Sequence, residues 1–183
     1  HPLARLLREP RGTPVKLIHI TDIHIQDDKI LGQAPIANFT ACLAHVETHH
    51  RDADRVVITG DLTHHGSRHS YAQLREIVMA SPLEPRLLLG NHDDRATFRA
   101  VFPEAPIDPA GFVQYAEDTP AGRFLYLDTL EPGTHAGRYC DARQLWLAQE
   151  LERARAEGRP VYLFMHHHPC PIGAPASDMI GLL

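Results

Sequence analysis

Histidine and aspartate stand out among the residues of this chain that could do chemistry. The chain has 14 histidines among 183 residues, against one tryptophan and three methionines. Imidazole is the most frequent side-chain metal ligand in proteins. Several histidines stand beside an aspartate or asparagine, directly after a short apolar segment. The four polar groups are Thr21-Asp22-Ile23-His24, Gly60-Asp61, Gly90-Asn91-His92-Asp93 and His166-His167-His168-Pro169.

The apolar segments before these groups have the composition of β-strands, and longer amphipathic segments separate them. This alternation predicts an α/β protein with a mainly parallel sheet at its start. The strands predicted at 111–115 and 123–128, joined by a polar Asp-Thr-Pro-Ala-Gly segment, are expected to form a hairpin. The predicted strands are 15–20, 55–59, 86–89, 111–115, 123–128 and 161–165, and the predicted helices are 37–50, 68–80 and 141–157. In the last helix, Leu145, Leu147, Ala148 and Leu151 lie near one predicted apolar face.

The position of the polar groups predicts that they meet in space. In a parallel sheet the carboxyl ends of the strands lie along one edge, where α/β proteins bind ligands. Asp22 and His24 alternate in a segment expected to be extended, so both side chains can point the same way and hold one ion. Asp61 follows a glycine that permits a tight turn, and its two oxygens can bridge two ions. Asn91 supplies an amide oxygen.

The 166–168 run adds an imidazole nitrogen from one of its histidines. Mixed oxygen and nitrogen ligands suit Mn, Fe, Co or Zn better than Mg or Ca. With two divalent ions, the charges of Asp22, Asp61 and one hydroxide leave a single positive charge, which attracts a singly negative phosphodiester. The sequence therefore predicts two divalent metal ions as cofactors.

Each pattern has a simpler reading when it is taken alone. Asp-x-His is more often a turn or a cap, Gly-Asn-His-Asp is typical of a tight turn, and a histidine run can be a surface feature. His64 and His65, close after Asp61, are interpreted first as loop residues, with contact to the substrate as the alternative. The joint placement of all four groups after predicted strands favours the metal site.

In combination these motifs resemble the calcineurin-like metallophosphoesterase family. The fuller forms at 59–63 (Thr-Gly-Asp-Leu-Thr), 90–95 and 144–147 (Gln-Leu-Trp-Leu) resemble its bacterial class III cyclic nucleotide phosphodiesterase and glycerophosphodiesterase branch. The resemblance implies a two-sheet sandwich flanked by helices. It also implies a metal-dependent phosphoric diester hydrolase that uses a metal-bridging hydroxide.

The resemblance further implies a role for each matching residue. Asp22 and His24 bind the first metal, Asp61 bridges, and Asn91 binds the second metal. His92 is the catalytic histidine that contacts the phosphate and helps the leaving group depart.

The histidine ligand of the second metal comes from the run before Pro169. In the family this ligand stands two residues before proline, which indicates His167 rather than His166; the choice between the two stays open at this point.

The family's closing Gly-His-x-His motif has no counterpart after Gly173. We therefore expect residues 1–183 to form a single metallophosphoesterase domain that is incomplete at its C-terminal end. Such a chain is expected to bind metal loosely, to hydrolyse diesters poorly and to self-associate as a homo-oligomer.

Composition narrows the partners. The net charge of −5, with no Lys/Arg-rich run, argues against a nucleic-acid polymer and leaves a small phosphodiester as the expected substrate. No apolar stretch reaches the ~18–20 residues that span a bilayer, so no membrane partner is expected. Three cysteines without CxxC spacing favour a reducing, cytoplasmic compartment. Two other functions remain as alternatives to a phosphodiester hydrolase. One is a phosphomonoesterase on the same scaffold, and the other is a non-catalytic metal-binding remnant.

Overall fold

The computed structural model of the protein describes residues 14–182. Strands and helices alternate through most of this part of the chain. In chain order the elements are β1 (Leu17–Ile20), α1 (Pro35–His49), β2 (Arg55–Thr59), α2 (Arg68–Ala80), β3 (Arg86–Leu88), α3 (Arg95–Val101), β4 (Tyr115–Thr119), β5 (Gly122–Tyr126), α4 (Asp141–Ala156), β6 (Val161–Phe164) and α5 (Pro175–Asp178).

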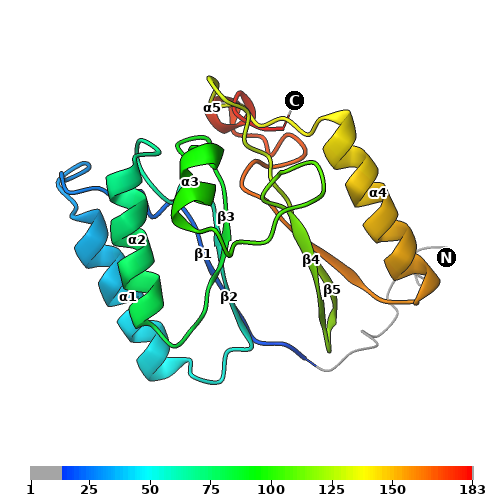
Figure 1. Cartoon of the computed structure of the whole chain (residues 1–183), viewed down its shortest axis with the longest axis horizontal. Helices are drawn as coiled ribbons and strands as arrows, with labels where there is room; N and C mark the ends of the chain where they lie inside the picture. The colour runs from blue at the N-terminus through cyan, green and yellow to red at the C-terminus, as the bar shows by residue number, and fades with distance from the viewer. Residues whose placement is uncertain (1–13, 183) are drawn as a thin grey trace.

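The strands form two three-stranded sheets. The first sheet has the order β1-β2-β3 and is parallel throughout. The second has the order β4-β5-β6, with β4 antiparallel and β6 parallel to β5. Figure 1 shows the sheets side by side, with α1 and α2 outside the first and α4 outside the second. The predicted two-sheet sandwich flanked by helices is therefore confirmed.

Strand β2 shows how the two faces of the first sheet are used. Val57 is completely buried in the cluster between the sheets, and the next residue, Ile58, is completely buried in the cluster under the helices. Successive side chains of a strand point to opposite faces, so an unbroken apolar run suits a strand covered on both sides. The cluster between the sheets consists of Val57, Leu88, Phe124 and Tyr126.

The predicted hairpin is confirmed, but its first strand lies later in the chain than expected. β4 starts at Tyr115, where the predicted strand 111–115 ends. The backbone amides of Phe112 and Val113 donate to the carboxylates of Asp108 and Asp128, at 2.8 and 3.0 Å. These amides are therefore taken by side chains, and the strand ladder begins after them.

Helix α4 packs with a different face from the one predicted. Leu145 and Leu151 are 62% and 40% exposed, so their assignment to the packing face is wrong. The buried positions are Arg143, Glu150 and Ala154. Arg143 donates to main-chain carbonyls of the loop after β5, and Glu150 pairs with a buried arginine of that strand. Leu147 of the predicted face does pack, against Leu125 and Leu127, so polar and apolar contacts together set the rotation of the helix.

Helix α3 is the shortest of the helices that flank the two sheets. α3 was not predicted; it has seven residues and is capped by Asp94, whose carboxylate accepts the Thr97 amide at 2.7 Å. Within this described part, no helix combines the length and the apolar character needed to cross a membrane.

Candidate metal centre

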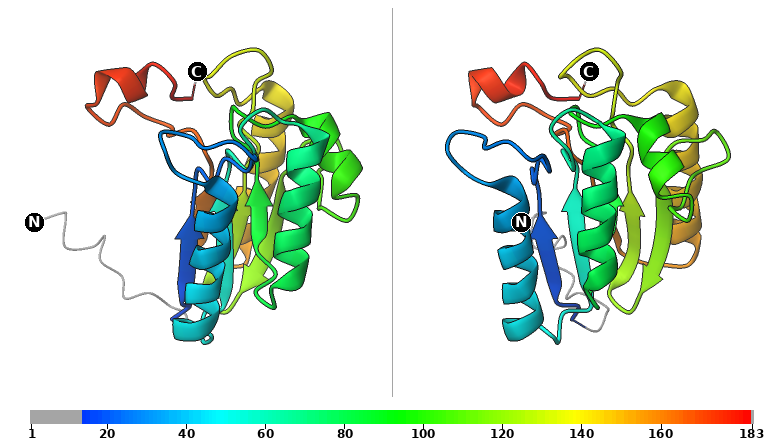
Figure 2. Two further views of the ribbon diagram at one scale, coloured as in Figure 1. Left: turned by 90° about the vertical axis from the view of Figure 1, so that its left-hand side faces the viewer. Right: turned by 60° about the vertical axis from the view of Figure 1, so that its left-hand side comes forward.

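The loops after β1, β2, β3 and β6 leave from the same end of the two sheets (Figure 2). The loop segments after β1 and β2 also remain paired beyond the strands. The Asp22 amide donates to the Gly60 carbonyl at 3.2 Å, and the His24 amide donates to the Asp61 carbonyl at 2.9 Å. This pairing sets Asp22 and His24 beside Asp61.

The backbone at these residues is not the extended segment that the sequence analysis assumed. The φ angles of Asp22, His24 and Asp61 are 56°, 44° and 49°, in the left-handed region, so the expected extended alternation is wrong. A turn brings the side chains together instead. His24 Nε2 lies 3.8 Å from Asp22 Oδ1 and 3.5 Å from Asp61 Oδ2. Non-glycine residues in this region cost about 1–3 kcal/mol each and concentrate at functional sites.

Two glycines allow the strand ends to close around Asp61. A methyl group on Gly60 would lie 2.7 Å from the Gly90 nitrogen and 2.8 Å from the His166 ring. A methyl group on Gly90 would collide with Asp61 and lie 2.9 Å from His166 Nε2. The Gly-Asp and Gly-Asn motifs can therefore lie in contact only because neither glycine carries a side chain.

His166 faces this centre with one defined nitrogen. Its Nδ1 lies 2.8 Å from the Thr59 carbonyl, so Nδ1 carries the proton and donates it. Its Nε2 then turns a lone pair toward Asn91 Oδ1 at 3.2 Å and Asp61 Oδ1 at 3.5 Å. Three acceptor atoms facing one another repel unless a cation lies among them. The residues thus fit a metal ion, and the Thr59 carbonyl is the outer partner that metal-binding histidines usually have.

Asn91 is oriented by His135, a residue that belongs to none of the four sequence motifs. Its amide nitrogen lies 2.9 Å from Nδ1 of His135, which leaves Oδ1 turned toward His166. His135 stands on the loop between β5 and α4, outside every motif that was considered. A lone histidine in a Pro/Gly-containing loop gives no signal strong enough to single it out.

His167 is placed differently from His166. It is 3% exposed, and its Nδ1 lies 2.7 Å from the Thr129 hydroxyl. Burial, together with the neighbouring imidazole of His166, lowers the pKa of His167 to about 4. The structure therefore brings His166, rather than His167, to Asp61 and Asn91.

His92 lies beside the cluster, within reach of Asp61. Its amide donates to Asp61 Oδ1 at 2.9 Å, and its Nδ1 donates to the His64 carbonyl at 2.8 Å. Its Nε2 lies 4.0 Å from Asp61 Oδ2. The ring is thus held in one orientation with Nε2 toward the centre.

The potential ligands fall into two compact groups. One consists of Asp22, Asp61 and His166, and within it one ligand atom of each residue lies within 4.8 Å of the others. His24 and His92 form the second group with His64, under the same limit. The 3.5 Å contact between His24 and Asp61 joins the two groups into one centre.

Asp93 holds the loops after β2 and β3 together. Its carboxylate accepts the amides of Leu62 at 3.0 Å, Thr63 at 3.1 Å and Gly90 at 2.9 Å. Burial raises the pKa of Asp93 to about 6, although these hydrogen bonds favour the ionised form. These contacts let Asp93 brace the turn that carries Asn91.

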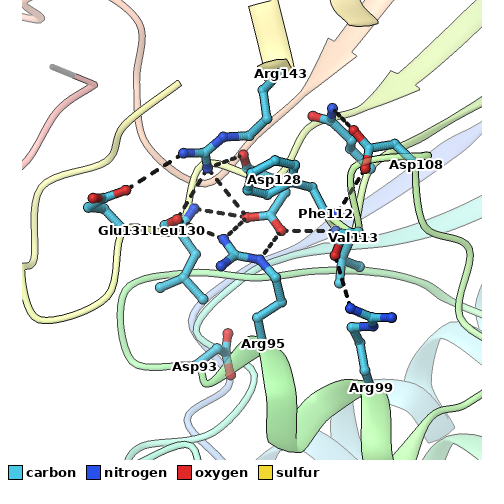
Figure 3. A network of polar contacts seen from close by, with 12 residues as sticks. Asp93, Arg95, Arg99, Asp108, Phe112, Val113, Asp128, Leu130, Glu131 and Arg143 are labelled. Atoms are coloured by element: carbon cyan, nitrogen blue, oxygen red, sulfur yellow. Dashed lines mark hydrogen bonds and ion pairs between the residues drawn. The ribbon is translucent and has the colours of Figure 1, made fainter. Parts of the chain in front are cut away.

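Arg95 ties the same turn to the second sheet, as Figure 3 shows. Its Nε and Nη2 donate to the two oxygens of Asp128 at 2.7 and 2.8 Å, and Nη2 also donates to the Leu130 carbonyl. Asp128 is fully buried after β5, one residue before the threonine that holds His167. The network therefore fixes the distance between the loops that carry Asn91 and the histidine run.

Several known proteins have sequences similar to that of this chain. Residues 15–181 match the sequence profile described as Calcineurin-like phosphoesterase. A probable cyclic nucleotide phosphodiesterase of Rhodopseudomonas palustris is 35% identical over 172 residues, which cover 92% of this chain and 62% of that protein. The glycerophosphodiester phosphodiesterase GpdQ of Enterobacter lignolyticus is 32% identical over 90% of this chain and 61% of its own length. The 3',5'-cyclic adenosine monophosphate phosphodiesterase CpdA of Escherichia coli is 29% identical, over 92% and 60% respectively. The chain thus spans about three fifths of the length of these relatives.

Proposed function

The chain belongs to the calcineurin-like phosphoesterase family, and from this premise we propose that it hydrolyses phosphodiesters with two divalent metal ions. The observation that carries the proposal is the position of His166 Nε2, which lies 3.2 Å from Asn91 Oδ1 and 3.5 Å from Asp61 Oδ1. Such an arrangement is suited to a cation.

The proposed ligand set divides between two ions that share Asp61. Asp22 and His24 complete the first site, and Asn91 and His166 complete the second. Two such ions, when bound, would polarise the phosphoryl oxygens and make hydroxide available at neutral pH. The mixture of carboxylate, amide and imidazole donors favours Mn, Fe, Co or Zn.

His92 is proposed to assist the leaving group. Its Nδ1 is tied to the His64 carbonyl, so Nε2 is the only ring atom that can exchange a proton with substrate. In the protonated state, Nε2 can donate to the departing ester oxygen, as general acids do. The main-chain hydrogen bond to Asp61 holds His92 beside the proposed metal centre.

The surroundings of the site suit a small diester. A cavity of about 370 Å³ adjoins Asp22 and His24 and has apolar walls that include Ile23, Leu31 and Phe39. It has room for the organic group of a substrate, and the net charge of −5 does not favour a long nucleic acid. We propose a substrate of the cyclic nucleotide or glycerophosphodiester type, the two kinds named in the relatives.

The test compares a diester and a monoester on one protein. Purified protein with added Mn is expected to hydrolyse bis(p-nitrophenyl) phosphate faster than p-nitrophenyl phosphate, and a chelator should abolish the reaction. A preference for the monoester would replace the proposal by a phosphomonoesterase. Metal binding without any hydrolysis would instead indicate a non-catalytic metal-binding protein.

His166 and His167 form a matched pair for testing the ligand assignment. His166→Ala is expected to remove about one equivalent of metal per chain, because Nε2 faces Asp61 and Asn91. His167→Ala should keep the metal and mainly lose stability, because it empties a buried position. Loss of metal in the His167 variant alone would reverse the assignment.

A further inference from the structure

His64 lies opposite His24 because the loops after β1 and β2 stay paired. The Ile25 amide donates to the Leu62 carbonyl at 3.0 Å, and the His64 amide donates to the Ile25 carbonyl at 3.4 Å. This main-chain pairing fixes the position of the His64 backbone, from which the ring extends toward His24. The His24 and His64 rings meet edge to face with centroids 5.3 Å apart.

The two rings meet through their Nδ1 atoms. His24 Nδ1 lies 3.4 Å from His64 Nδ1, while His24 Nε2 faces Asp61. Of two neutral imidazole nitrogens in contact, one must donate and the other must accept. A His24 that offers its Nε2 lone pair to a cation carries its proton on Nδ1, so His64 Nδ1 must be the acceptor.

His64 also contacts the proposed general acid. Its carbonyl accepts the proton of His92 Nδ1 at 2.8 Å, and its ring stacks on that of His92 with centroids 5.1 Å apart and an angle of 16°. One residue therefore touches a proposed ligand through Nδ1 and the proposed acid through its main chain.

We propose that His64 is a positioning residue that holds the His24 imidazole in the tautomer and orientation that bind the first metal ion. The inference rests on the proposed function, since it presupposes that His24 is a ligand. Histidine ligands usually donate their second ring N–H to a carbonyl or a carboxylate, and loss of that partner weakens metal affinity or activity. Here an imidazole fills the place of that oxygen.

The decisive experiment compares two substitutions of one side chain. His64→Leu removes the acceptor, whereas His64→Asn places an amide oxygen where Nδ1 stood. Mn titration of the protein is expected to show one of two equivalents weakened by about 10–100-fold in His64→Leu, and within a few-fold of normal in His64→Asn. His69→Ala is the control, because this exposed imidazole pairs with Asp27 and should leave Mn binding unchanged.

Several outcomes would overturn the inference. Equal weakening in both variants would show that the imidazole itself, or the loop, is needed. Unchanged Mn affinity in His64→Leu would show that His24 needs no partner, and weakening of both equivalents alike would indicate general disruption. Thermal unfolding of the metal-free variants shows whether each one folds, and His64→Asn carries the test if His64→Leu does not. The titration needs no substrate, so a selective loss supports the role of His64 even if diester hydrolysis is absent.

Discussion

Asp61 and Asp128 are both buried carboxylates at the end of a strand, yet their surroundings differ. Asp61 is 4% exposed, and its ion pairs within residues 14–182 are all with imidazoles, at 3.5 to 4.0 Å. Asp128 is 0% exposed and receives two short hydrogen bonds from Arg95 and two from backbone amides. A second guanidinium, that of Arg143, lies 3.8 Å away.

The difference separates a proposed metal ligand, Asp61, from a structural anion, Asp128. A buried charge is tolerated when it is paired and hydrogen-bonded, which describes Asp128. Both arginines beside it also lie over the Phe112 ring, so this part of the molecule is closed to an ion. Asp61 has no permanent cation among its described neighbours, and bound metal ions would supply the missing positive charge.

The strongest test of this contrast is Asp61→Ala. We expect both metal ions to be lost together, because the two proposed sites share this carboxylate. Activity should fall by about 10³-fold or more, since bound metal ions contribute several kcal/mol to such reactions. Metal content per chain is the measurement, and retention of one full equivalent would refute the bridging role.

His92→Ala is expected to separate metal binding from turnover. His92 contacts Asp61 through its main chain, which alanine keeps, so metal content should stay nearly intact. Turnover should slow by ~10²–10⁴ if Nε2 acts as general acid. The informative substrate has a poor leaving group, and a near-normal rate on it would contradict the assignment.

Asp128→Asn should lower stability and keep metal binding, whereas Asp61→Ala should abolish metal binding. The Asp128 substitution leaves Arg95 without its buried counter-charge, which typically costs about 3–5 kcal/mol, while Arg143 keeps its contact with Glu131. The free energy of unfolding, measured in urea, is expected to fall by that order. Metal affinity of the folded fraction should change little, and a loss of metal at unchanged stability would show that the contrast between the two aspartates is wrong.

A smaller effect is expected at Glu117, a carboxylate that arginines neutralise as they do Asp128. Burial alone would raise the pKa of Glu117, but hydrogen bonds from Arg86 and Arg55 lower it to about 2. A folded-state pKa below the unfolded value of about 4.3 contributes stability that is present above that pH and is lost as the pH falls toward about 2. Glu117→Gln should therefore lower stability by about 2 kcal/mol near neutral pH, after allowance for solvent screening.

The measurement for Glu117 is urea unfolding of both proteins across this pH range. The difference in the free energy of unfolding between wild type and Glu117→Gln should become smaller as the pH falls below about 4.3. A difference that stays constant with pH would show that the carboxylate charge does not carry the effect.

The location of the site followed from local sequence alone. Apolar segments such as 55–59 predict strands from composition, and residues after parallel strands must converge at one edge of the sheet. These two rules were enough to bring Asp22, Asp61 and Asn91 together, because they depend on neighbouring residues and on the connectivity of the sheet.

The details of the site depended on contacts between distant parts of the chain. The choice of His166 over His167 follows from which ring meets the Thr59 carbonyl, 107 residues away in sequence. The roles proposed for His64 and His135 rest on contacts with His24 and Asn91, which no spacing rule encodes.

Contacts between distant residues also explain why the packing face of α4 and the start of β4 were predicted wrongly. The rotation of α4 is set in part by Arg143 and the loop after β5, and the start of β4 by carboxylates that take the amides before it. Hydrophobic periodicity registers apolar side chains, whereas these positions also depended on polar groups that find their partners only after the chain has folded.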